Sequence, residues 1–262
     1  MKIKKYKYIM ILFSLLALAV SNGNPEEITA TQDESQMTEE NNEMENIKTQ
    51  GEDSTEKEAL FDQIKTENDK VRKVFMKSTI KIIEADNTQI QTMDADALYG
   101  DDLLIIKADL ISETNDGYYY EIAFDENDNT KAYIIEKQAG EEETTVTETT
   151  VETFDIQPDY HRLIQAVMDL KDDLEVSEDG GTIKLSLKEN AEDVLKYIEN
   201  EYNLELTLVE EDEIEISMDI EFDKESKLLK SISLVLDPQI DELEDQEISV
   251  ESTFTEHQFD SQ

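Results

Sequence analysis

The chain has 262 residues and carries 66 acidic against 23 basic side chains, a net charge of −43 at pH 7. Such a surface repels polyanions, so we expect no binding to nucleic acid. Cysteine is absent, which excludes disulfides, thiolate catalysis and cysteine-based zinc sites.

The N-terminus has the three parts of a secretory signal peptide. Four lysines lie among the first seven residues, an uncharged apolar run covers residues 9–20, and small polar residues follow from Ser21. The apolar run is shorter than the roughly 20 residues of a membrane-spanning helix. We therefore expect a signal peptide over residues 1–21 and a secreted or cell-envelope-associated protein. An uncleaved signal that tethers the chain is the alternative.

Residues 22–57 contain no aromatic side chain and are rich in acids, amides and hydroxyls. A segment of this kind buries too little apolar surface to offset its ordering entropy, so a disordered acidic linker is predicted. Thr55 and Glu58 have the spacing of a capping box. Apolar residues then recur at helical spacing, which predicts a helix to about Arg72 and a folded domain over residues 58–262.

The first half of this domain reads as a series of strands. Apolar and polar residues alternate, and Asp116-Gly117 and the Asn-rich stretch near residue 128 supply turn chemistry. Short spacing between such segments favours antiparallel hairpins. The strands are expected over residues 74–83, 103–110, 118–124, 131–137 and 144–154.

The second half mixes helices with strands. A helix is predicted from Pro158 to Leu174 and another from Asn190 to Tyr202, each with an apolar stripe. Strict alternation of acidic and apolar residues over 213–222 predicts a strand with one face in a core. The full set of strands expected here covers residues 182–187, 204–209, 213–222, 228–236 and 248–259.

This order of elements predicts an α+β fold: one strongly curved antiparallel sheet, a half-barrel of about eight to ten strands. Helices are expected to pack on its concave face. The transition at residues 64–83, the helix 160–174, the segment 182–208 and the hairpin 214–236 resemble the LolA/LppX-like half-barrel superfamily, in particular its small uncharacterised Gram-positive lipoproteins. The resemblance implies lipid or acyl-chain binding between sheet and helices. The chain departs from those lipoproteins in lacking the cysteine that carries their lipid.

Motifs for catalysis or metal binding are weak. Of the two histidines, His161 and His257, neither has a Gly-x-Ser-x-Gly or Ser-x-x-Lys nucleophile motif to accompany it. Residues 125–136 partly match a calcium loop, but Thr130 stands where that loop has glycine, which favours a hairpin turn over weak calcium binding. No enzyme activity, cofactor or metal is therefore expected.

The proposed ligand site uses residues on the apolar faces of two strands and one helix. For the face that carries Tyr118, Tyr120 and Phe124, core packing is the simpler interpretation. The candidates are Tyr118, Tyr120, Phe124, Leu163, Val167, Ile216, Met218 and Ile220. The expected partner is a lipid or acyl chain bound to a monomer. The alternative function is an acidic interaction or structural protein that meets a cell-envelope protein and binds no small ligand.

Overall fold

The structure is a computed structural model that describes residues 47–84, 87–125, 128, 130–150, 156–188, 194–202, 204, 213–239 and 246–259. Residues 1–46, which include the expected signal peptide and most of the expected linker, lie outside the described residues.

The helices are α1 (Ile47–Asn68), α2 (Tyr160–Asp169) and α3 (Val194–Tyr202), with a 3-10 turn at Lys171–Asp173. The strands are β1 (Val71–Glu84), β2 (Asn87–Tyr99), β3 (Ile105–Thr114), β4 (Tyr119–Phe124), β5 (Lys131–Lys137), β6 (Thr145–Thr150), β7 (Leu174–Asp179), β8 (Thr182–Leu187), β9 (Ile214–Asp223), β10 (Leu229–Pro238) and β11 (Gln246–Phe259).

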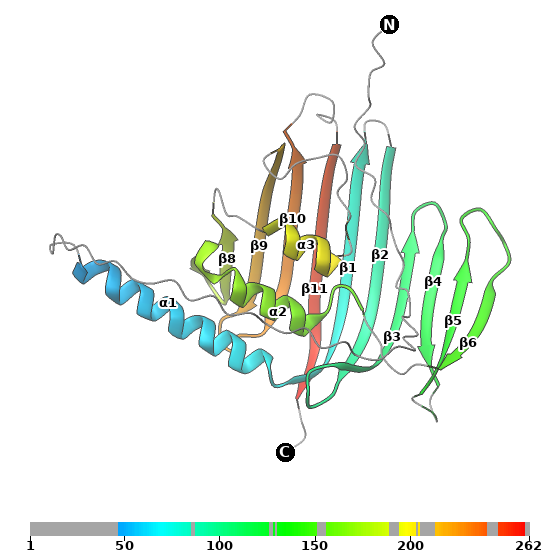
Figure 1. Cartoon of the computed structure of the whole chain (residues 1–262), viewed down its shortest axis with the longest axis horizontal. Coiled ribbons are helices and arrows are strands. Elements are labelled where there is room, and N and C mark those ends of the chain that lie inside the picture. The colour runs from blue at the N-terminus through cyan, green and yellow to red at the C-terminus, as the bar shows by residue number, and fades with distance from the viewer. Residues whose placement is uncertain are drawn as a thin grey trace, which may run out of the picture.

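All strands described belong to one antiparallel sheet in the order β6-β5-β4-β3-β2-β1-β11-β10-β9-β8-β7. The sheet does not close into a barrel, because β6 and β7 remain at opposite edges (Figure 1). The α+β half-barrel expected from the sequence is thus confirmed. The described part has eleven strands, above the eight to ten expected.

The alternating pattern of β9 sets its two faces as the sequence predicts. Met218, Ile220 and Phe222 are buried, while Glu215 is exposed. Side chains alternate between the two faces along each strand, and paired residues on neighbouring strands point to the same face. The whole sheet therefore has one inner and one outer face. The inner faces of β8–β11 and β1–β5 therefore form one continuous core, and the helices lie on this side over β1 and β8–β11 (Figure 1).

Helix α2 begins where Asp159 caps it. The Asp159 carboxylate accepts a hydrogen bond from the backbone N–H of Arg162 at 2.9 Å, which satisfies one of the free N–H groups of the first turn. Leu163, Ile164 and Val167 then recur on one side of the helix and are all buried. Their burial fixes α2 against the sheet.

Helix α1 departs from the prediction at both ends. It begins at Ile47 and ends at Asn68, so residues 47–57 of the expected linker are helical and Thr55 lies inside the helix instead of capping it. Glu, Lys and Gln are good helix formers even where apolar residues are few. The Lys57 ammonium also donates a hydrogen bond to the Leu174 carbonyl at 2.7 Å, which anchors this part of the helix.

Two strands, β2 and β7, are absent from the sequence prediction. Inner positions of β2 hold small residues such as Ala95 and Ala97, so its apolar alternation is weak, although both are buried by neighbouring strands. In β7, only Leu174 is buried, because the strand is a sheet edge. The strand expected over 204–209 lies outside the described residues except for Leu204.

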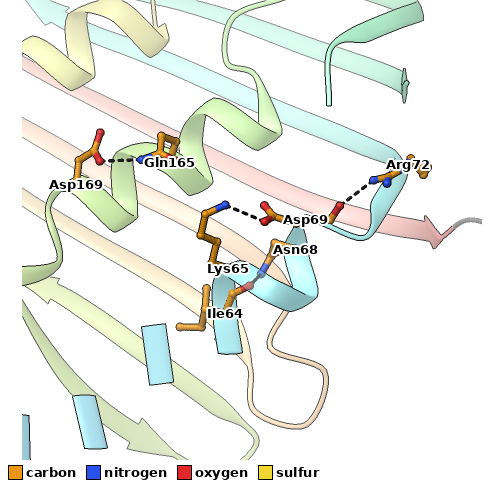
Figure 2. A network of polar contacts seen from close by, with 7 residues as sticks. All are labelled: Ile64, Lys65, Asn68, Asp69, Arg72, Gln165 and Asp169. Carbon is orange, nitrogen blue, oxygen red and sulfur yellow. Dashed lines mark hydrogen bonds and ion pairs between the residues drawn. The ribbon is translucent and has the colours of Figure 1, made fainter. Parts of the chain in front are cut away.

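The Asn68 carboxamide joins three parts of the fold. Its side-chain nitrogen donates to the Ile64 carbonyl at 2.7 Å, drawn in Figure 2, and to the Lys227 carbonyl at 2.8 Å. Its oxygen accepts from the Tyr160 hydroxyl and from the Leu229 N–H, the latter at 3.1 Å. Asn68 is fully buried, so the end of α1, the start of α2 and the start of β10 all depend on this one side chain.

We predict that Asn68→Ala lowers the free energy of unfolding by about 3 kcal/mol or more, since each buried polar group left unpaired costs about 1–3 kcal/mol. Urea-induced unfolding measures this loss. The control is Asn115→Ala, because Asn115 also bridges strands, donating to Thr88 and accepting from Ile90, but is exposed. Water can replace those bonds, so a loss below about 1 kcal/mol is expected. Equal losses in the two variants would contradict the role given to the buried carboxamide.

Candidate apolar binding pocket

A pocket opens between α2, α3 and the inner faces of β9 and β10. Its volume is about 30 Å³, which is room for about two water molecules at roughly 10–15 Å³ each. The lining is apolar apart from one carboxylate and two phenols. It consists of Leu163, Ala166, Val167, Leu170, Tyr197, Glu201, Tyr202, Met218, Ile220 and Ile232.

The apolar wall follows from the periodicity of α2 and the pleat of β9. Leu163, Val167 and Leu170 are spaced four and three residues apart, so they lie along one side of the helix. Met218 and Ile220 are two residues apart, so they share the inner face of the strand. The pocket lies where these two apolar surfaces do not completely fill the space between them.

An ion pair closes one side of the pocket. Arg162 Nε lies 3.3 Å from Glu201 Oε2, and the Glu201 side chain is only 13% exposed. A second contact joins the same regions, because the Gln157 side-chain amide donates to the Asn200 carbonyl at 2.9 Å. The last turn of α3 is thus tied to the start of α2 by polar contacts at the pocket edge.

Tyr202 is the buried phenol of the pocket, with 6% of its surface exposed. Burial raises the pKa of its hydroxyl, an effect that the neighbouring Ser252 hydroxyl only partly opposes. The Tyr202 hydroxyl forms no hydrogen bond of good geometry within the described residues. It therefore remains a protonated O–H donor at neutral pH with unused bonding capacity.

The structure brings together four of the eight residues proposed from the sequence. Leu163, Val167, Met218 and Ile220 all line the pocket. Ile216 lies on the same face of β9, two residues before Met218, but packs against the core outside the described lining.

The aromatic candidates in β4 and just before it lie elsewhere on the sheet. Strand β4 is five strands from β10 in the sheet order, which is roughly 24 Å along the sheet at about 4.8 Å per strand. Tyr120 and Phe124 are buried, and the Tyr118 hydroxyl donates to Glu136 Oε1 at 3.3 Å. These three side chains cannot line the same small pocket as α2.

The remaining lining residues were not proposed from the sequence. Ala166 and Leu170 extend the apolar stripe of α2, and Ile232 pairs with Ile220 across the sheet, so periodicity and register could have found them. Glu201 carries a charge and gives no apolar signal. Its place in the lining depends on how α3 is oriented, which the sequence does not state.

His161, the second residue of α2, is buried against the start of β1. Its Nε2 lies 3.1 Å from the Val71 carbonyl oxygen, and its ring meets that of Tyr99 edge-on at 4.5 Å between centroids. Burial lowers the pKa of His161 to about 4, although the Val71 carbonyl and the Asp69 carboxylate oppose this shift. The side chain is placed for packing, and the imidazole is neutral at pH 7.

We predict that His161 makes the fold sensitive to acid. Its pKa is about 4 when folded and about 6.5 when unfolded, so between these values the unfolded chain binds the proton more tightly. The contribution of neutral His161 to stability is complete above about pH 6.5 and is lost as the pH falls toward 4. His161→Gln should reduce the loss of unfolding free energy between pH 7 and 4.5, measured by urea titration. Identical pH profiles for the two proteins would contradict this, since all other groups titrate in both.

The described part of the chain holds neither a metal-binding group nor a membrane-spanning helix. No group of three or more histidine or acidic side chains there is arranged to hold a metal ion. No described helix combines the length and the apolar run that a bilayer crossing requires.

Comparison with known proteins gives limited matches. No protein-family model and no curated protein sequence matches the chain. Among solved structures, it is similar to a DUF1329 family protein from Desulfovibrio piger, with 10% sequence identity and a TM-score of 0.23. That match covers 78% of this chain and 92% of the other.

Proposed function

We propose that this protein is an exported, non-enzymatic binding protein that holds the aliphatic part of a hydrophobic ligand between α2, α3 and the sheet. The observation that carries the proposal is the apolar pocket on the concave side, with walls built by Leu163, Val167 and Ile220. The same arrangement of sheet and helices is what the resemblance to LolA-like half-barrel proteins implies. Pockets of this kind, apolar with few polar groups, are where such ligands bind.

The small volume of the pocket requires that α3 move when a longer chain enters. The ion pair that joins Glu201 of α3 to Arg162 of α2 is weak. The Arg162 side chain is 41% exposed, and a solvent-exposed ion pair contributes about 1 kcal/mol or less. Each buried methylene gains about 0.8 kcal/mol, so a chain of about six methylenes gains roughly 5 kcal/mol. Chain burial therefore outweighs loss of the ion pair.

The chemistry of the lining supports binding over catalysis. Glu201 is the one ionisable carboxylate in the described lining, and it is already paired with Arg162. The phenols of Tyr197 and Tyr202 are the other polar side chains there. This set offers no nucleophile with an adjacent base, which acyl or glycosyl transfer would need.

Native mass spectrometry of the full chain, purified from the medium and envelope of its source organism, tests the proposal. We expect part of the protein to carry an added mass that dissociates as an aliphatic compound. Ala166→Leu places extra carbon atoms in the pocket from α2 and should abolish the added mass. Gln165→Leu introduces the same side chain at the exposed neighbouring position and should retain it.

Two results would overturn the proposal. The first is apo protein alone in the wild type and both variants. The second is an aliphatic ligand retained equally by Ala166→Leu, which would place the ligand outside this pocket.

A further inference from the structure

A group of three buried hydroxyls lies next to the apolar pocket. Ser252 of β11 pairs with Ile232 of the pocket wall on one side and with Ser78 of β1 on the other. Directly paired side chains lie about 5 Å apart on one face of a sheet. Ser78 is 4% exposed and Ser252 1%, and the Ser252 hydroxyl lies beside that of Tyr202. We call Ser78, Ser252 and Tyr202 the hydroxyl cluster.

The hydroxyl cluster has more donors than acceptors in use. The two serine hydroxyls share one hydrogen bond of 2.7 Å, and Tyr202 forms none of good geometry among the described residues. Each hydroxyl carries one hydrogen that it can donate. Within the described residues, one well-aligned bond among three hydroxyls leaves two O–H donors without a well-aligned acceptor. Both are buried, where an unpaired polar group costs about 1–3 kcal/mol.

The charges around the pocket disfavour an anionic partner for these donors. Glu201 is negative, and the guanidinium of Arg162 is already paired with it at 3.3 Å. The chain as a whole carries a net charge of −43, which also disfavours an anionic ligand. Burying a carboxylate or phosphate here without a free cation would be costly, whereas a neutral oxygen that accepts two hydrogen bonds would not.

We propose that the ligand is a neutral amphipathic molecule: an aliphatic chain in the pocket, ending in a carbonyl or ester oxygen that accepts hydrogen bonds from the hydroxyl cluster. This inference rests on the proposed function, since it names the ligand class of the same pocket. It excludes free fatty acids and phospholipid headgroups as the preferred polar end. Tyr202 is the specificity-determining residue, because it alone belongs both to the pocket lining and to the hydroxyl cluster.

The test uses the full chain and two kinds of probe at pH 8. N-phenyl-1-naphthylamine is a neutral fluorescent probe without oxygen and reports on the apolar pocket. Methyl decanoate and decanoate, which share one chain and differ in charge, are then measured by displacement of that probe. We expect methyl decanoate to bind the wild type at least about tenfold more tightly than decanoate, a difference of about 1.4 kcal/mol.

Tyr202→Phe removes only the hydroxyl. It should weaken methyl decanoate about three- to tenfold, the usual effect of losing one neutral hydrogen bond. The affinity for N-phenyl-1-naphthylamine should change less than the affinity for the ester, because this probe has no oxygen to accept the bond. The substitution should lower the unfolding midpoint in urea only slightly, because the lost hydroxyl forms no well-aligned hydrogen bond within the described residues. Tyr119→Phe, which removes a hydroxyl that donates to Glu121 far from the pocket, is the control and should change neither affinity.

The outcomes separate the two proposals. If N-phenyl-1-naphthylamine and methyl decanoate both fail to bind, the proposed function fails and this inference fails with it. If both bind but decanoate binds as tightly as the ester, the pocket stands and the neutral ligand is wrong. Unchanged ester affinity in Tyr202→Phe, or a clear loss of stability in that variant, would likewise overturn the role of the hydroxyl cluster.

Discussion

One buried carboxamide, that of Asn68, joins the end of α1, the start of α2 and the start of β10. An asparagine side chain offers two donor hydrogens and an acceptor oxygen with two lone pairs, and here both groups are used by α1, Lys227, Tyr160 and β10. Because Tyr160 is the first residue of α2, this bond ties the start of that helix to the end of α1. The Asp159 cap and the burial of Leu163, Ile164 and Val167 then hold α2 against the sheet.

The pocket is a consequence of that placement. With α2 held at its N-terminal end, its apolar stripe meets the inner faces of β9 and β10, and α3 closes the other side through the Arg162–Glu201 pair. One cross-strand row then runs from Ile220 through Ile232 to Ser252 and Ser78. Along this row, the surface changes from apolar to hydroxyl-bearing within two strands, which is the pattern that an amphipathic ligand fits.

Sequence periodicity predicted most strands of the sheet and four of the ten residues that line the pocket. Strands with strict alternation, such as β9, were predicted with nearly correct bounds, because a period of two is a direct consequence of the pleat. Strand β2 was missed, because Ala95 and Ala97 are buried by their neighbours and carry little apolar signal of their own. The distance between β4 and β10 could not be deduced from local sequence patterns, since the strand order depends on the long-range pairing of β1 with β11. For the same reason, Tyr118 and Tyr120 were grouped with residues that lie several strands away.

The central claim is that an aliphatic chain enters beside α2 and β9. Methyl NMR of 13C-labelled methionine tests it directly, since Met218 lines the pocket while Met76 and Met93 are buried at other inner positions of the sheet. On titration with methyl decanoate, we expect a saturable shift of the Met218 methyl signal, with those of Met76 and Met93 unchanged. An unmoved Met218 signal at saturating ester, or a larger shift at Met93, would contradict it.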